Sequence, residues 1–170
     1  MKKLIANQGF DIPTAIAAGI PLRVIVYTDG ASRGNPGPAS IGVAIYDEKE
    51  KEIKKYGQAI GKATNNQAEY GAVVFALKKI KSLFGRKKII NIEVEIRSDS
   101  ELLVNQLQGN YKILDADIQT LFVIIWNLKI DYKKVNFVLV PREKNRMADF
   151  LANEALDQEG REKTLFQSLK

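Results

Sequence analysis

Residues 26–47, VYTDGASRGNPGPASIGVAIYD, show a strand–loop–strand pattern from which the fold can be predicted. A predicted strand over residues 22–29 is apolar on both faces, as in a central strand, and it ends in Asp29. A Gly/Pro-rich loop follows, and a second apolar strand is predicted over residues 40–47. Residues 52–60 form a third, more exposed strand after a charged turn. We therefore expect an antiparallel meander at the start of the domain.

Helices and strands alternate after the meander. The spacing of Val73, Leu77, Ile80 and Phe84 predicts a helix that Gly85 ends. Strict alternation predicts a strand with one wet face, made by Glu93, Glu95 and Arg97. The remaining predicted elements are the strands 90–99 and 134–141 and the helices 100–109, 115–130 and 145–158, of which 115–130 is expected to be the most buried. The order predicts an α/β fold: a five-stranded mixed sheet, three antiparallel strands and then parallel strands, with helices on both faces.

The composition fits one globular domain. The 170 residues are 45% hydrophobic, and we divide them into an N-terminal extension (1–20), a domain (21–158) and a C-terminal tail (159–170). Residues 11–20 could form a short helix. No apolar run is long enough to span a membrane, and polar residues interrupt the apolar N-terminal stretch, so we expect neither a membrane segment nor a signal peptide. The lack of cysteine fits a reducing compartment. We expect a cytoplasmic monomer.

Histidine is also absent, which leaves carboxylates as the main candidates for acid–base or metal chemistry. The net charge of +6 slightly favours a polyanionic partner such as nucleic acid. Asp29 and Asp99 end two strands; if those strands are parallel neighbours, both side chains emerge at the same carboxyl edge. Glu69 and Asp149 lie in the predicted first turns of two helices. Taken singly, each of these two fits a helix-dipole partner, and Asp99 fits a helix cap.

Four converging carboxylates without basic partners would repel one another, unless divalent cations neutralise them. A donor set of oxygen atoms alone suits Mg²⁺ or Mn²⁺ rather than Zn²⁺. Two such ions about 4 Å apart can promote phosphodiester cleavage. The carboxylates therefore favour a metal-dependent phosphotransfer site.

Four ordered blocks make the chain resemble type 1 ribonuclease H across residues 22–157. The blocks are YTDGASRGNPGPASIGVAI, TNNQAEYGAVVFAL, IRSDSELLVNQLQG and VPREKNRMADFLANEAL. The resemblance implies the ribonuclease-H-like fold and cleavage of the RNA strand of RNA–DNA hybrids, leaving 3′-hydroxyl and 5′-phosphate ends. It implies two Mg²⁺ ions, with Mn²⁺ as a possible substitute. Asp29, Glu69, Asp99 and Asp149 fall on the family's catalytic, metal-binding positions.

The resemblance also implies substrate contacts. The Gly/Pro-rich loop would follow the minor groove of the hybrid, Thr64 would lie near a DNA phosphate, and Lys112 could contact a phosphate. The implied substrate-binding residues are Gly30, Ala31, Ser32, Asn35, Thr64, Asn65, Asn66, Gln67 and Lys112. The alternatives are a plain hairpin loop, a helix cap at residues 64–66 and a surface lysine. Tyr111 could contact a sugar or pack in the core.

The chain departs from the family pattern in two places. The histidine that precedes the last aspartate in the best-known members is missing, and the nearby polar candidates are Arg142, Glu143 and Lys144. The basic protrusion of many members is also missing, as in shorter members of the family. The rival interpretations are a non-catalytic nucleic-acid-binding module, a resolvase- or transposase-like enzyme and a sugar-kinase-like ATPase.

Overall fold

The computed structural model describes residues 22–168, with side chains for residues 23–162. The N-terminal extension and its expected helix lie outside the described residues. The strands are β1 (Leu22–Ser32), β2 (Gly37–Asp47), β3 (Glu52–Ala63), β4 (Ile92–Ser98) and β5 (Lys134–Leu139). The helices are α2 (Asn65–Phe84), α3 (Arg86–Ile89), α4 (Glu101–Leu107), α5 (Ala116–Ile130) and α6 (Arg146–Ser168), with a short 3₁₀ helix η1 (Arg142–Lys144) before α6.

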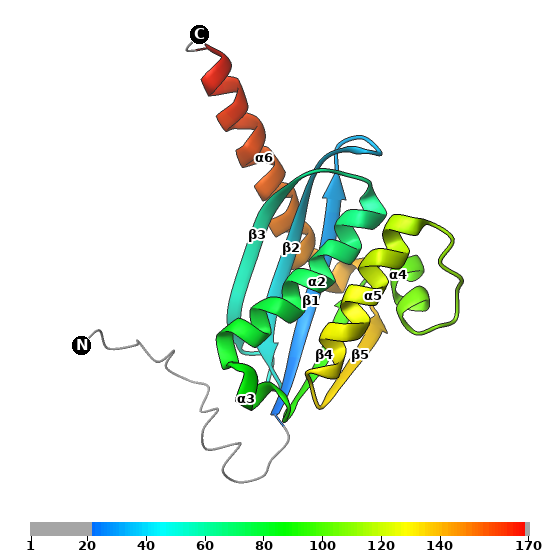
Figure 1. The fold of residues 1–170 in the computed structure, drawn as a ribbon. Coiled ribbons are helices and arrows are strands. Elements are labelled where there is room, and N and C mark those ends of the chain that lie inside the picture. Colours follow the sequence, from blue (N-terminus) through cyan, green and yellow to red (C-terminus); the bar gives the residue numbers. More distant parts are fainter. Residues whose placement is uncertain (1–21, 169–170) are drawn as a thin grey trace, which may run out of the picture.

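The five strands form one mixed sheet in the order β3-β2-β1-β4-β5 (Figure 1). β1 pairs antiparallel with β2 and parallel with β4, and β4 pairs parallel with β5. The apolar β1 is therefore the central strand, because neighbours on both edges and helices on both faces cover it. This confirms the expected fold.

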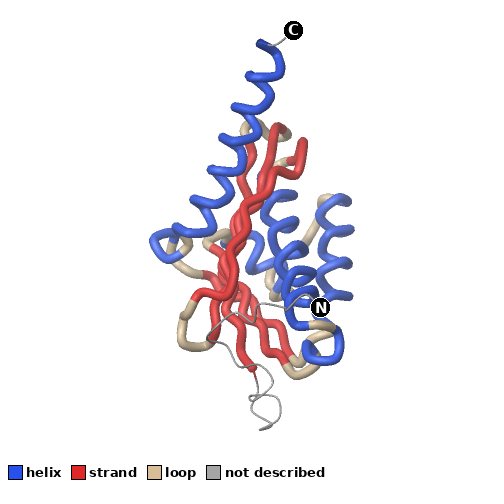
Figure 2. The backbone as a smooth tube through the Cα atoms, turned by 90° about the vertical axis from the view of Figure 1, so that its left-hand side faces the viewer, coloured by secondary structure: helices blue, strands red, loops and turns tan. Residues whose placement is uncertain are grey.

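The sheet is the middle of three layers (Figure 2). α6 lies on one face, while α2 and α5 lie on the other. α2 places Val73, Leu77 and Ile80 against the sheet, and all three are fully buried. Gly85 ends α2 as expected. α6 continues to Ser168, past residue 158, where the sequence predicted the domain to end.

Three predicted strands were too short, including β3, which was expected to end at residue 60 and continues to Ala63. β1 does not end at Asp29 but continues to Ser32, and β2 begins at Gly37 rather than at residue 40. The reason is that antiparallel pairing continues through the glycines and alanines, as in the pair Gly30–Ile41. The connecting loop is therefore residues 33–36 only. On β4, the expected wet face is partly closed, because ion pairs from Arg23 and Arg97 cover Glu95, which is 9% exposed.

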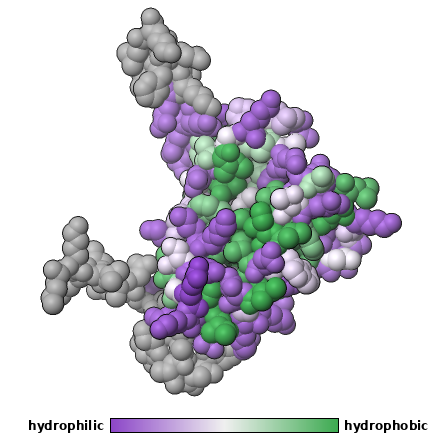
Figure 3. Space-filling view, in the orientation of Figure 1, coloured by the Kyte–Doolittle hydropathy of each residue, from purple (hydrophilic) through white to green (hydrophobic). Residues whose placement is uncertain are grey.

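The prediction that α5 is the most buried helix was wrong. Only Ile118 and Ile125 are buried, whereas Val123, Trp126 and Ile130 are at least half exposed. α5 packs beside α2, so its far side faces outward. In the space-filling view of this face, apolar side chains gather across the middle (Figure 3). No helix among residues 22–168 combines the length and apolarity that a membrane crossing requires.

Candidate active site

The parallel pairing of β1 and β4 places Asp29 and Asp99 at the same end of two neighbouring strands. The last registered pair is Tyr27 with Arg97, and each aspartate lies two residues further on. Asp99 is not a helix cap, because the Ser100 side chain accepts the hydrogen bond from Leu103 N that caps α4. The position of Asp99 therefore has no explanation in local capping.

Glu69 joins this end of the sheet because α2 approaches β1 at a glycine. A Cβ atom at Gly30 would lie only 2.2 Å from the backbone nitrogen of Glu69, so no larger residue fits there. Since α2 begins at Asn65, Glu69 starts the second turn rather than the first, contrary to our expectation. The capping box of Thr64 and Gln67 satisfies the helix start instead. The helix-dipole explanation of Glu69 loses its basis.

A second close approach brings in Asp149, in the first turn of α6 as expected. Asp29 pairs with Gly42 across β1 and β2. A Cβ atom at Gly42 would lie 1.9 Å from the carbonyl oxygen of Ala148, so the start of α6 rests on bare backbone. Two glycines on neighbouring strands thus admit the two helices that carry Glu69 and Asp149.

The four carboxylates interact as like charges. Burial, followed by the charges of Asp99 and Asp149, raises the pKa of Asp29 from its usual 3.8 to about 7. Burial, followed by the charges of Asp29 and Asp99, raises the pKa of Glu69 to about 9. The structure therefore brings together all four residues that the sequence proposed as the catalytic, metal-binding set.

These residues fit a hard divalent cation. Every donor is an oxygen, and Oε2 of Glu69 is buried without a hydrogen-bond partner. No three acidic side chains among residues 23–162 already form a metal-binding group. The carboxylates would therefore have to move closer together around a cation. The unpaired, buried Oε2 of Glu69 is the clearest indication that this site binds a cation.

The expectation that the cluster lacks a basic partner was wrong. Nη2 of Arg142, on η1, lies 3.8 Å from Oδ1 of Asp149, and its charge offsets part of the rise in the pKa of Asp29. An open pocket of about 320 Å³ is lined by Arg142, Glu143, Arg146 and Asp149. Of the three polar candidates at residues 142–144, Arg142 is the one that pairs with a site carboxylate in the described structure.

Asn145 is a site residue that the sequence did not reveal. Its side chain is 1% exposed, and Nδ2 donates to Oδ1 of Asp99 at 2.6 Å and to the carbonyl oxygen of Thr28 at 3.0 Å. Asparagine directly before a helix is a common cap, which hides any second role in the sequence. Here the buried amide orients Asp99 and ties the start of α6 to β1.

The residues proposed for substrate contact divide into two regions. In the first, the β1–β2 loop meets the start of α2: Oδ1 of Asn35 accepts from Asn65 N at 3.0 Å. Ser32 donates to Ala63 O, and Ala31, Ser32 and Thr64 are partly exposed, whereas Gly30 is buried. Asn65 and Asn66 are exposed. Thr64 is the helix cap, and both polar ends of the Gln67 side chain are engaged, with Thr64 N and Asp117.

The second region is the loop between α4 and α5. Lys112 is exposed there. Tyr111 is 47% exposed and donates to Glu101, so the alternative that it packs in the core was wrong. The Gln67–Asp117 hydrogen bond joins the start of α2 to the first turn of α5, directly after this loop.

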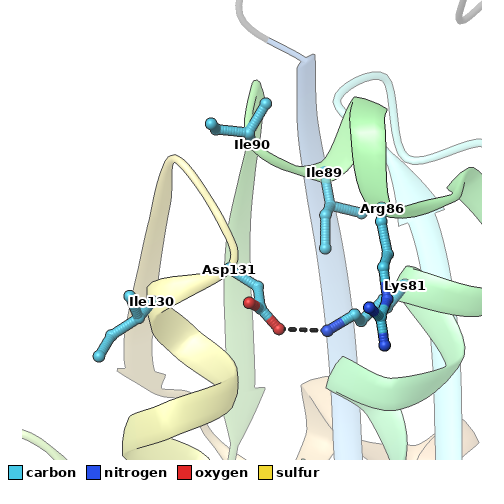
Figure 4. Close-up of a pocket in the computed structure, with 6 residues that line it drawn as sticks. All are labelled: Lys81, Arg86, Ile89, Ile90, Ile130 and Asp131. Atoms are coloured by element: carbon cyan, nitrogen blue, oxygen red, sulfur yellow. Dashed lines mark hydrogen bonds and ion pairs between the residues drawn. The ribbon is translucent and has the colours of Figure 1, made fainter.

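Another pocket, of about 360 Å³, lies away from the carboxylates (Figure 4). Ile89, Ile90 and Ile130 line it, and the Lys81–Asp131 ion pair crosses its side beside Arg86. Residues 89 and 90 precede β4, whereas Asp99 follows it. This pocket therefore sits at the opposite end of the parallel strands and is not part of the candidate active site.

Comparison with known proteins agrees with this geometry. A family model described as reverse transcriptase-like matches residues 27–155, which include the whole carboxylate cluster. The fold and the site thus place the chain in the class of ribonuclease-H-like proteins. Ribonuclease HI of Halobacterium salinarum is 39% identical over 157 residues, covering 91% of this chain and 76% of the relative. The chain belongs to the ribonuclease H1 family.

Two further proteins are similar to the chain. LC11-RNase H1 was isolated from compost by a metagenomic approach. Its crystal structure in complex with an RNA/DNA hybrid superposes on this chain with a TM-score of 0.76, and the two sequences are 46% identical. The match covers 80% of this chain and 98% of the LC11-RNase H1 chain. The bifunctional protein Rv2228c of Mycobacterium tuberculosis is 36% identical over 80% of this chain, which spans only 36% of that protein.

Proposed function

We propose that the protein is an endoribonuclease that hydrolyses the RNA strand of RNA–DNA hybrids with the help of divalent cations, leaving 3′-hydroxyl and 5′-phosphate ends. The observation that carries the proposal is the convergence of four carboxylates from β1, α2, the end of β4 and α6 on one edge of the sheet. The hybrid complex of a relative 46% identical supports the choice of substrate.

In this proposal Asp29, Glu69, Asp99 and Asp149 hold two Mg²⁺ ions, with Mn²⁺ as a substitute. When bound, such ions supply positive charge where negative charge develops on a phosphodiester. Asn145 holds the Asp99 carboxylate in place by its 2.6 Å hydrogen bond. The exposed Arg142 supplies a further positive charge beside Asp149. Asn35 and Asn65, which a hydrogen bond joins, would contact the groove of the hybrid. Lys112 would contact its phosphate backbone.

The second candidate is a nucleic-acid-binding module that has the fold but does not cleave. The raised pKa values of Asp29 and Glu69 argue against it, because a pure binding module gains nothing from buried carboxylates that repel one another.

The test is incubation of the protein with end-labelled RNA–DNA, RNA–RNA and DNA–DNA duplexes, with Mg²⁺, with Mn²⁺ and with chelator. We expect cleavage of the RNA strand of the hybrid only, and only with a divalent cation. Asp29→Asn should abolish it. Binding of the hybrid without any cleavage by the wild type would favour the binding module instead.

A further inference from the structure

A buried pair of polar side chains links the helix that carries Glu69 to the α4–α5 loop. Tyr70 is 1% exposed, and its hydroxyl donates to Oε1 of Gln106 on α4 at 2.9 Å. Nε2 of Gln106 donates in turn to the backbone carbonyl of Lys112 at 3.0 Å. Two hydrogen bonds therefore connect the residue after Glu69 with the backbone of the residue proposed to meet a phosphate.

The chemistry of the partners fixes the direction of this chain. A backbone carbonyl only accepts, so Gln106 must present its amide nitrogen to Lys112 and its oxygen to Tyr70. The Tyr70 hydroxyl must then donate. Burial raises the pKa of Tyr70 to about 12, which keeps it protonated at any working pH. Neither side chain leaves a buried polar atom unpaired within residues 23–162.

Residues in the first turns of α2 contact the helices at both ends of the loop. Beyond Lys112, Nε2 of Gln67 donates to Oδ2 of Asp117 at the start of α5 at 2.9 Å. α2 and α5 begin side by side at the same end of the molecule (Figure 1). Gln67 and Tyr70 thus flank Glu69 in the sequence, and they contact the elements that precede and follow the loop, through Gln106 on α4 and Asp117 on α5.

We propose that Tyr70 and Gln106 are positioning residues that keep Lys112 in register with the carboxylate cluster, so that the loop binds the nucleic-acid backbone while the cluster meets the scissile strand. The inference rests on the proposed function, because it concerns the binding of the same hybrid. A long lysine side chain binds more tightly when its backbone is already fixed, since less conformational freedom is lost on binding.

The test compares Tyr70→Phe and Gln106→Met with a matched control, Tyr132→Phe. Tyr132 is also buried, at 5% exposed, and its hydroxyl donates to the carbonyl of Leu77, away from the loop. Losing one buried hydrogen bond in the relay should raise the KM for the hybrid about three- to tenfold. kcat at saturation should stay within about twofold, because the carboxylates do not move. Tyr132→Phe should lower the melting temperature similarly and leave KM unchanged.

A double-mutant comparison identifies Lys112 as the residue through which the pair acts. Lys112→Ala should raise KM in the wild type, but add little in the Tyr70→Phe background. Hydrogen exchange of residues 108–115 should be faster in Tyr70→Phe and unchanged in Tyr132→Phe.

The inference is overturned if Tyr70→Phe and Tyr132→Phe have the same KM or the same loop protection. A wild type that fails to cleave the hybrid contradicts the proposed function instead. In that case the exchange measurement still decides the inference, because unchanged loop protection in Tyr70→Phe overturns it and faster exchange supports the positioning of the loop.

Discussion

Gly30 lies directly against the backbone of Glu69, and a Cβ atom at residue 30 would come within 2.2 Å of the Glu69 nitrogen. The contact is between two backbones, so no side-chain rotation can relieve it. The glycine is therefore a condition for bringing α2, and with it Glu69, to the end of β1. The substrate role implied for Gly30 by the family resemblance remains a prediction.

Gly30→Ala should force α2 away from β1. We expect a loss of about 1–3 kcal/mol in the free energy of unfolding and a fall in hybrid cleavage larger than that loss alone explains. Denaturant unfolding and initial rates measure both. Gly160→Ala is the control, because nothing lies within 4 Å of a Cβ there and alanine favours a helix. Wild-type activity in Gly30→Ala would disprove the packing argument.

Asp29→Asn should separate the site from the scaffold. It removes one charge from a repelling cluster, so in metal-free buffer the melting temperature should equal or exceed that of the wild type, while cleavage is abolished. Mg²⁺ should stabilise the wild type through binding to the folded state, by about 2.7 kcal/mol at a hundred times its Kd, and the variant less. Calorimetry with and without Mg²⁺ tests both parts. A marked loss of stability in Asp29→Asn would instead mean that Asp29 serves as a structural hydrogen-bond acceptor.

The stability of the metal-free protein should fall as pH rises. The pKa values of Asp29 and Glu69 are raised in the folded state, to about 7 and about 9, so the folded protein holds these protons more tightly than the unfolded chain. Their stabilising contribution is complete below the usual values of 3.8 and 4.5, and it is lost as pH rises through the folded values.

Urea unfolding in chelator at pH 5, 7 and 9 measures this dependence. Glu69→Gln cannot ionise and should show a shallower decline, and so should the wild type in saturating Mg²⁺, which favours the charged forms. Equal slopes for the wild type and Glu69→Gln would exclude a raised pKa at Glu69.

Asn145→Asp should impair catalysis although the shape of the side chain barely changes. It replaces the amide that donates to Asp99 with a carboxylate that repels it, in a position that is 1% exposed. We expect at least a tenfold loss of kcat, because a misplaced carboxylate near the reacting centre is costly. Weaker Mg²⁺ binding by calorimetry should accompany it. Asn153→Ala is the control, since Asn153 also contacts a site aspartate, Asp149, but from the exposed surface; its activity should change less than about twofold.

The order of strands and helices follows from the sequence alone. Hydrophobic period separates strands from helices, and helical connections favour parallel strands, so the sequence predicted that Asp29 and Asp99 share one end of the sheet if their strands are neighbours. The structure shows that β1 and β4 are parallel neighbours. The turn chemistry of Gly85 acts within a few residues, so a local rule located the end of α2, whereas the cap was left open among residues 64–66 until the structure assigned it to Thr64.

Features that depend on a neighbour distant in sequence become visible only in the folded protein. The apolar sequence of α5 predicted a buried helix, but its exposure depends on which elements pack around it. In the described part of the chain α2 packs against one side of α5, and Val123, Trp126 and Ile130 stay at least half exposed. Asn145 bonds to Asp99, 46 positions away, and the sequence pattern carries no signal for such a contact. The same holds for Tyr70 and Gln106, which are 36 positions apart. A buried hydrogen bond requires its donor and acceptor to lie within narrow limits of distance and angle. Only the packing of the folded backbone places two groups from distant parts of the sequence in that geometry.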